Sequence, residues 1–388
     1  MKTTPVAVLS AKRTPMGRFG KGLAGESAVS LGIHAASATL LAAELGNEKP
    51  TLSVMGQVLQ AGCGQNPARQ VALGAGMDPS SVAYTVNMVC GSGLKAIHLA
   101  SLALREGSHD LALAGGMESM SNTPYYARKA RWGLTYGDAP LVDGMLTDGL
   151  VDAYSGKHMG LSAEWVAETY GVQREEMDRY SVESHSRALS SENDLSEEII
   201  PIKTRRGEVE RDENPRRTDL STLGKLRPVF KKEGVVTAGN ASALNDGAAT
   251  LLLASQSWVD AHNVTPLGWL HESVDGGVPP HEVLMSPLSV FFNLKRLSGL
   301  SPVDFDLLEI NEAFAVQMVA LINQLDLDAH KVNPQGGAVA LGHPIGCSGA
   351  RLPLSALYQL KNKGGGAAFV TLCLGGGGGT GMVIRTSP

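Results

Sequence analysis

Cysteine is scarce in this 388-residue sequence, and its few occurrences are widely spaced. The four residues are Cys63, Cys90, Cys347 and Cys373. None forms a C-x-x-C pair, which argues against a zinc ribbon, and four cysteines in so long a chain do not suit the disulfide framework of a small secreted domain. We therefore expect free thiols in a reducing compartment and no metal site.

Three other features are missing, and each absence argues against a class of protein. The net charge of −5 lacks the basic excess that usually accompanies nucleic-acid binding. No apolar run approaches the roughly 20 residues of a membrane span. The N-terminus has neither the apolar core of a signal peptide nor an Arg/Ser-rich presequence, and residues 386–388 are not a peroxisomal address. The sequence thus predicts a soluble cytoplasmic protein that binds neither nucleic acid nor membranes.

Glycine, by contrast, is abundant, with 46 residues in a chain that is 43% hydrophobic. Such a composition is typical of a globular protein with many tight turns. Strand-like runs at residues 6–9, 54–59 and 111–114 alternate with helical patterns such as residues 29–45. This alternation predicts an α/β fold with a largely buried sheet.

The C-terminal part of the chain repeats the plan of the N-terminal part. Residues 90–93 and 346–349 each carry a Ser-Gly pair that opens a helical pattern, and each pattern leads to a strand that ends in glycines. These similarities indicate two related halves, or else a chance likeness in a glycine-rich chain. Residues 121–240 are more charged and contain a helical pattern at 163–190, so we interpret them as an insertion in the first half. A strand pattern at 248–254 then completes that half.

Cys90 is the first candidate for chemistry, because it follows a strand-like run and precedes Gly91-Ser92-Gly93 and a helix. Unpaired N–H groups and the dipole at a helix N-terminus favour a thiolate, so we expect a lowered pKa and a nucleophilic thiol. The flanking glycines would let backbone N–H groups approach a reacting carbonyl. The alternative is a small buried apolar side chain, which most free cysteines are.

Three further residues lie beside glycines or at the boundary of a predicted element. His343 is held between glycine and proline and could accept a proton, unless it only stabilises a turn. Cys373 ends a predicted strand before five glycines, which suggests backbone in close contact with a ligand or a loop, or else a flexible turn. Asn311 could bind water or an enolate oxygen, or simply cap a helix. Two thiols and a histidine suit a reaction in which one thiolate holds an acyl group and the other moves a proton at carbon.

These residues lie in motifs that resemble those of the thiolase family, in its acetyl-CoA acetyltransferase group. The matching motifs occur in family order along nearly the whole chain. These motifs comprise residues 64–70, 90–93, 114–120, 157–160, 239–242, 244–248, 311–314, 342–346 and 373–376.

The resemblance implies a five-layer α/β/α/β/α sandwich of two similar halves, with a loop domain inserted in the first half. The corresponding N-terminal half would comprise residues 1–120 and 245–266, and the C-terminal half residues 267–388. The inserted CoA-binding loop domain would comprise residues 121–244.

The resemblance also implies a role for each residue of the catalytic centre. Cys90 would be acylated, and His343 would activate its thiol and later bind a thioester oxygen. Asn311 would position a water beside His343, and Cys373 would remove or return the α-proton of acetyl-CoA. The backbone N–H groups of Cys90 and Gly375 would form the second oxyanion site.

A further set of residues matches the family's CoA and acyl pocket: Leu150, His158, Met159, Arg216, Phe230, Ser242, Met285 and Phe314. Arg216 is our choice for a CoA phosphate, although Pro215 occupies the strict alignment position. Residues 285–289 form a loop about two residues shorter than that of relatives, which leaves the substrate range open.

The expected reaction is reversible conversion of two acetyl-CoA molecules to acetoacetyl-CoA and CoA, without a tightly bound cofactor. One alternative is a degradative 3-ketoacyl-CoA thiolase for longer chains, and another is a silent acyl-CoA-binding protein with the same fold. A ketosynthase normally uses two histidines and no second catalytic cysteine. By analogy we expect a homo-oligomer, either a dimer or a tetramer; the sequence does not indicate which, nor the physiological direction of the reaction.

Overall fold

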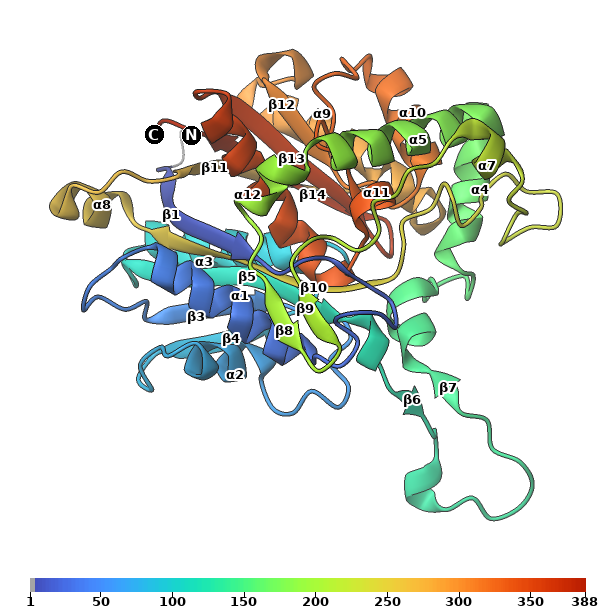
Figure 1. Cartoon of the computed structure of the whole chain (residues 1–388), viewed down its shortest axis with the longest axis horizontal. Coiled ribbons are helices and arrows are strands. Elements are labelled where there is room, and N and C mark those ends of the chain that lie inside the picture. The colour runs from blue at the N-terminus through green and yellow to red at the C-terminus, as the bar shows by residue number, and fades with distance from the viewer. Residues whose placement is uncertain (1–3) are drawn as a thin grey trace.

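The computed structural model describes residues 4–388, which form five alternating layers of helix and sheet (Figure 1). Two mixed sheets are stacked with a pair of helices between them, and further helices cover both outer faces. The sheets are linked at one edge, where β1 pairs with β11 through three residue pairs. The predicted five-layer α/β/α/β/α sandwich is therefore confirmed.

The first sheet has the order β1-β10-β5-β3-β4, and a short strand, β2, pairs with β10. Helices α1 and α2 pack together, and α1 covers the outer face of β10, β5 and β1. The elements of this half are β1 (Val6–Arg13), β2 (Gly17–Arg18), α1 (Ala28–Ala42), β3 (Leu52–Gly56), α2 (Pro67–Gly74), β4 (Val82–Val86), α3 (Ser92–Arg105), β5 (Leu111–Ser119), β10 (Asn245–Ala254) and α8 (Gln256–His262).

The second sheet has the order β12-β13-β14-β11, and α9 covers its outer face. Helix α10 lies beside α9, α4 and α5 on the same side. The elements of this half are β11 (Gly268–Gly277), α9 (Ser286–Ser298), β12 (Leu307–Ile310), α10 (Ala315–Leu325), α11 (Ala338–Leu341), α12 (Ile345–Asn362), β13 (Ala367–Leu374) and β14 (Gly378–Arg385).

The central layer consists of α3 and α12, the helices that follow the two Ser-Gly motifs. These helices touch where the motifs meet. A Cβ on Gly93 would lie 2.7 Å from the backbone N of Ala350, and a Cβ on Gly349 would lie 2.6 Å from the N of Leu94. The paired glycines therefore have a physical reason, because only glycine permits this close approach at both helix starts.

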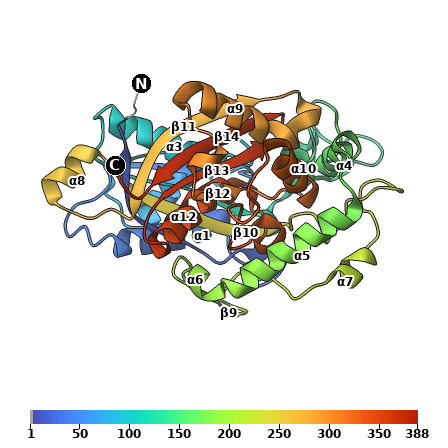
Figure 2. The same cartoon turned by 90° about the horizontal axis from the view of Figure 1, so that it is seen from above.

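The segment between β5 and β10 forms small elements of its own at one end and along one flank of the molecule (Figure 2). The predicted helix over 163–190 is wrong, because Gly171 adopts φ +68° and ends a first helix, after which a second helix begins. The elements are β6 (Tyr125–Tyr126), β7 (Val142–Asp143), α4 (Met159–Tyr170), α5 (Arg174–Ser190), α6 (Glu192–Ser196), β8 (Ile202–Thr204), β9 (Gly207–Val209) and α7 (Leu220–Gly224). The proposed domain limits at residues 120, 244 and 266 stay a prediction.

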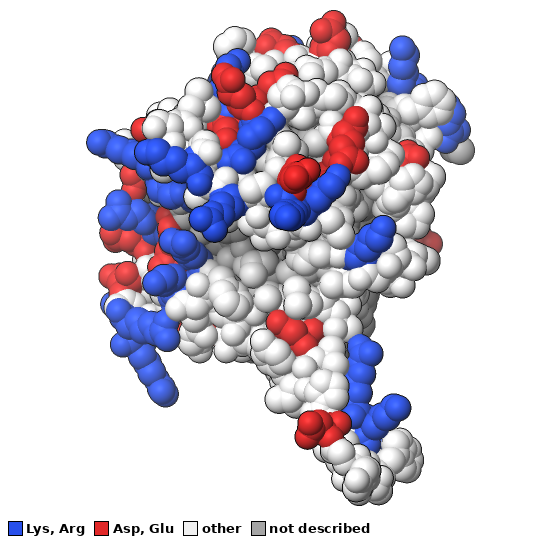
Figure 3. Space-filling view, turned by 90° about the vertical axis from the view of Figure 1, so that its right-hand side faces the viewer, with Lys and Arg blue, Asp and Glu red and all other residues white. Residues whose placement is uncertain are grey.

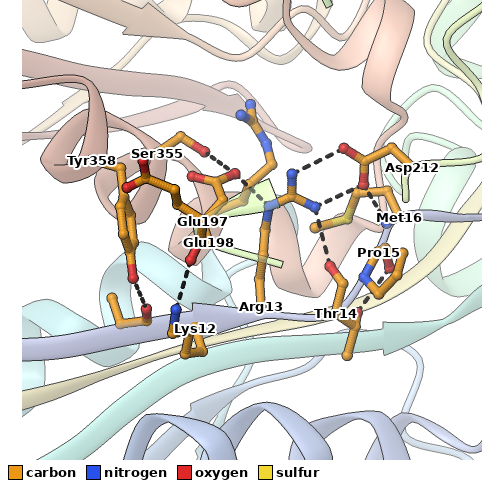
Figure 4. Close-up of polar contacts among 12 residues, drawn as sticks. Lys12, Arg13, Thr14, Pro15, Met16, Glu197, Glu198, Asp212, Ser355 and Tyr358 are labelled. Atoms are coloured by element: carbon orange, nitrogen blue, oxygen red, sulfur yellow. Dashed lines mark hydrogen bonds and ion pairs between the residues drawn. The ribbon is translucent and has the colours of Figure 1, made fainter. Parts of the chain in front are cut away.

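A buried charge network joins β1 to this inserted segment and to α12 (Figure 4). The fully buried Arg13 guanidinium donates to Glu198 at 2.5 Å and to both carboxylate oxygens of Asp212 at 2.7 and 2.9 Å. Ser355 on α12 donates to the same Glu198 carboxylate at 3.0 Å. Because α12 begins at the catalytic centre described below, the network fixes the helix that supports that centre.

Candidate active site

The chain bends sharply between β4 and α3, and Cys90 lies at this bend. Val89, a β-branched residue, adopts φ +47°, a conformation that costs on the order of 1–3 kcal/mol. The Ser92 hydroxyl donates to the Val89 carbonyl and accepts from the Met88 N–H, which locks the bend. The strained loop therefore holds the Cys90 thiol at the wall of a cavity of about 620 Å³.

His343 lies beside Cys90, with 3.3 Å between the Nε2 and Sγ atoms. On the other side of the ring, Nδ1 lies 2.6 Å from the Ser348 hydroxyl, which donates to the Pro344 carbonyl at 3.0 Å. A hydroxyl has one proton to donate, so Ser348 must accept from Nδ1–H. This tautomer leaves the Nε2 lone pair free to accept the Cys90 proton.

Both members of this pair are neutral at physiological pH. Burial raises the pKa of Cys90 to about 12, although the backbone N–H groups of Gly375 and Cys90 lower it. Burial also lowers the pKa of His343 to about 4, and the positive charge of Arg351 adds to the effect. The expected fall in the pKa of Cys90 is therefore wrong, because loss of hydration outweighs the helix N-terminus. The arrangement suits proton transfer to His343 during attack.

Asn311 and Cys373 are brought to the same place from the second half. The fully buried Asn311 places Nδ2 3.5 Å from His343 Nε2, and its Oδ1 has no hydrogen-bond partner within residues 4–388. It is not a helix cap, because α10 begins four residues later, at Ala315. Cys373, on β13, is 3% exposed and lines the cavity with Cys90. The four side chains singled out by sequence thus meet at one site.

The glycines after Cys373 form a tight turn between β13 and β14. Gly376 and Gly377 have φ values of +88° and +93°, and a Cβ on Gly377 would lie 2.3 Å from the Val278 carbonyl. The turn directs the Gly375 N–H toward Cys90 Sγ. Close contact with another loop therefore explains this glycine run, rather than flexibility.

The remaining wall of the cavity is largely apolar. His158 and Phe230 stack with ring centroids 4.6 Å apart, and Phe314 meets Phe230 edge-on at 6.3 Å. All but one of the residues assigned to the CoA and acyl pocket line this cavity. Those that line it are Leu150, His158, Met159, Arg216, Phe230, Ser242 and Phe314.

Met285 is the exception, since it does not line this cavity, and its assignment to the acyl wall stays a prediction. It lies at the end of a 3₁₀ turn (Pro280–Met285) and caps α9, with its side chain 1% exposed within the apolar core. Val283 and Leu284 line the cavity instead. This turn leads directly into α9, and Met285 packs in the same hydrophobic cluster as Cys373 and Phe314.

Sequence reasoning missed Ser348 and Arg18, both of which bear on this site. Ser348 lies in the second Ser-Gly motif, whose pattern indicates only the start of a helix. Arg18 lines the cavity with Arg216, and neither guanidinium forms an ion pair within the described part of the chain. Figure 3 shows Lys and Arg side chains gathered on one flank of a hollow in this face. Two unpaired arginines at the cavity suit an anionic ligand group.

Comparisons with known families agree with this geometry. Residues 6–257 match the family "Thiolase, N-terminal domain", and residues 264–386 match "Thiolase, C-terminal domain". The chain belongs to the thiolase family. The acetyl-CoA acetyltransferase of Escherichia coli (strain K12) is 43% identical to this thiolase over 97% of the chain and 98% of that protein. That of Chromobacterium violaceum is 42% identical over 98% of the chain and 99% of the relative.

Solved thiolase structures are equally similar in fold. The acetyl-CoA acetyltransferase of Syntrophomonas wolfei superposes with a TM-score of 0.96 at 35% identity, over 99% of both chains. Human mitochondrial 3-ketoacyl-CoA thiolase in complex with CoA gives a TM-score of 0.95 at 38% identity, again over 99% of both chains. This thiolase therefore shares its whole architecture with both proteins.

Proposed function

We propose that the protein is an acetyl-CoA C-acetyltransferase that converts two acetyl-CoA molecules reversibly to acetoacetyl-CoA and CoA. The observation that carries this proposal is the 3.3 Å contact between Cys90 and His343 at the wall of a cavity that Cys373 also lines. The names of the curated relatives, which match over nearly their whole length, support the same activity.

In the first half-reaction, His343 Nε2 takes the Cys90 proton as the thiolate attacks the thioester carbon. The backbone N–H groups of Cys90 and Gly375 hold the resulting oxyanion. When the tetrahedral adduct collapses, the departing CoA thiolate takes a proton from Cys373. The products are acetyl-Cys90, protonated His343, the Cys373 thiolate and free CoA.

In the second half-reaction, the Cys373 thiolate removes the α-proton of another acetyl-CoA. Protonated His343, with a water held by Asn311, stabilises the enolate oxygen. The enolate carbon attacks acetyl-Cys90, and the expelled Cys90 thiolate regains its proton from His343. Every group returns to its starting state, so the cycle needs no tightly bound cofactor.

The test is the variant Cys90→Ser, measured by turnover of acetyl-CoA and by circular dichroism. The exchange of one atom should leave the fold intact and lower turnover to background, because a buried hydroxyl is a far weaker nucleophile than a thiol. Turnover near the wild-type rate in a folded variant would refute the nucleophile and, with it, the mechanism.

The second candidate is a degradative thiolase for longer 3-ketoacyl chains, with which the human 3-ketoacyl-CoA thiolase neighbour is compatible. Thiolysis of 3-ketoacyl-CoA substrates from four to sixteen carbons separates the two. The biosynthetic proposal expects kcat/KM to be highest for acetoacetyl-CoA and to fall with each added pair of carbons. A maximum at longer chains would establish the degradative alternative.

We also propose a cytoplasmic homo-oligomer. A reducing compartment would keep the two catalytic thiols free.

Exposed side chains on two segments support the homo-oligomer. The edge strand β4 leaves Val82 56% and Tyr84 37% exposed, and such unpaired edges tend to associate. Figure 1 also shows the β6–β7 segment projecting from the body, where Trp132 and Tyr136 are exposed. Sedimentation should give a multiple of 40.6 kDa, whereas a single 40.6 kDa species would contradict the proposal.

A further inference from the structure

Gln317 on α10 is a polar side chain buried among apolar ones. It is 0% exposed, and its helix contributes to the same hydrophobic cluster as Phe314, Met318 and Cys373. Neither the Nε2 nor the Oε1 atom has a regular hydrogen-bond partner within residues 4–388. The mechanism proposed above assigns no step to this amide.

Burying an amide without partners is costly, on the order of 1–3 kcal/mol. A side chain that serves packing alone would be better replaced by leucine or methionine at such a position. The cost indicates that the amide has a partner in another state of the protein.

The Gln317 side chain lies close enough to the Cys373 thiol to lower its pKa, although no regular hydrogen bond joins the two groups within residues 4–388. Burial raises the pKa of Cys373 above its ordinary range, the nearby Cys90 raises it further, and the Gln317 side chain opposes both effects. A neutral thiol is a poor acceptor, whereas a thiolate accepts strong hydrogen bonds from amide N–H groups. A hydrogen bond from the Gln317 amide to this sulfur therefore becomes favourable when Cys373 loses its proton.

We propose that Gln317 is a positioning residue that donates a hydrogen bond to the Cys373 thiolate and aims its sulfur at the α-carbon of the second substrate. The inference rests on the proposed function, in which Cys373 gives its proton to the departing CoA and then takes one from acetyl-CoA. Gln317 neither gains nor loses a proton in this sequence. It stabilises the anion that exists between the two transfers.

The test compares two half-reactions in Gln317→Met, which keeps the length of the side chain and removes its donor. Proton abstraction is followed by ¹H NMR as deuterium entering the methyl group of acetyl-CoA in D₂O. Acylation is followed by mass spectrometry as acetyl transfer to Cys90. We expect deuterium exchange to slow about tenfold or more and its pH midpoint to rise, while acylation changes much less.

A second variant, Gln317→Glu, tests the donor at constant volume. A neutral carboxylic acid can still donate a hydrogen bond, whereas a carboxylate repels the thiolate. Exchange in this variant should therefore be retained at low pH and fall as the pH rises, opposite to the wild type. Gln324→Met, at an exposed position of the same helix, is the control and should behave as the wild type.

Two outcomes would overturn the inference: an unchanged pH profile of exchange in folded Gln317→Met, or equal losses in both half-reactions with a lower melting temperature. The latter would show a purely structural role. Failure of the wild type itself to acetylate Cys90 would instead refute the proposed function, so the two failures are distinguishable.

Discussion

The Cys90 thiol and the His343 imidazole meet as a neutral pair, and this protonation state governs the chemistry of the site. A preformed thiolate would attack without a base, but it would be costly in so dry a cavity. In the proposed mechanism, the neutral pair forms the thiolate only as the carbonyl is attacked. The charge then passes to an oxyanion held by the backbone N–H groups of Cys90 and Gly375.

This protonation state predicts the pH dependence of acylation. The folded pKa of His343 is about 4 and that of Cys90 about 12, so both groups stay neutral between these values. The rate of Cys90 acetylation should be nearly flat from pH 5 to 9 and should fall only as His343 becomes protonated near pH 4. Rapid quench with mass spectrometry measures this rate. A midpoint near 6.5 would indicate an ordinary, solvated histidine instead.

Ser348 should matter because it selects the tautomer of His343. In Ser348→Ala, the Nδ1–H loses its acceptor and the ring can turn or change tautomer. One hydrogen bond of this kind is worth about 1 kcal/mol, so acylation should slow about fivefold to tenfold. Ser348→Thr keeps the hydroxyl and serves as the control. An unchanged acylation rate in the alanine variant would show that other contacts fix the ring.

At the scale of single residues, sequence patterns identified Cys90, His343, Cys373 and Asn311, because each lies beside glycine or at an element boundary. They could not predict the protonation state of Cys90, since burial depends on residues far away in the chain. Nor could they show that Met285 is buried and does not line the cavity, because its position follows from the path of the chain into α9.

At the scale of elements, two tight bends bring the catalytic groups together: the one at Val89 and the glycine turn after β13. The sequence signals the second turn well, because glycine marks it, whereas the first is centred on a valine. It predicted one helix over 163–190, where Gly171 in fact separates two, because the apolar spacing continues across the break. Gly93 and Gly349 were noticed as a repeat, but only the structure shows that they let α3 and α12 touch.

The turn should tolerate no side chain at Gly377. In Gly377→Ala, a Cβ would meet the Val278 carbonyl at 2.3 Å, and φ +93° is unfavourable for alanine. We expect a loss of about 1–3 kcal/mol in the free energy of unfolding, together with slower acylation as the Gly375 N–H shifts. Urea denaturation measures the first quantity. Gly364→Ala, also at positive φ but in open space, separates backbone strain from the clash, and equal losses in both variants would exclude the clash.

At the scale of the whole molecule, the buried Arg13 network joins the first strand, the inserted segment and α12. The α/β class and the five layers could be predicted from the sequence, the layers through family resemblance. The network could not, because Arg13 lies 185 residues from Glu198 and 199 from Asp212, and all three are ordinary in local pattern. Long-range pairing of charges leaves no trace in a single sequence.

Arg13→Met should destabilise the fold strongly. Removing the cation leaves Glu198 and Asp212 buried without their partner, which typically costs about 3–5 kcal/mol. Chemical denaturation should show this loss. The double variant Arg13→Met with Glu198→Gln should lose less than the sum of the two single variants, because it removes both charges of one pair. Additive losses would show that the two residues do not interact.

The most direct test of the central claim is the mass of the protein after incubation with acetyl-CoA. The account predicts the addition of one acetyl group, located on the peptide that contains Cys90, and loss of that label when CoA is added back. Cys373→Ala should still acquire the label, although more slowly. An unlabelled protein that nonetheless forms acetoacetyl-CoA, or an acetyl group on Cys373 instead of Cys90, would contradict the account.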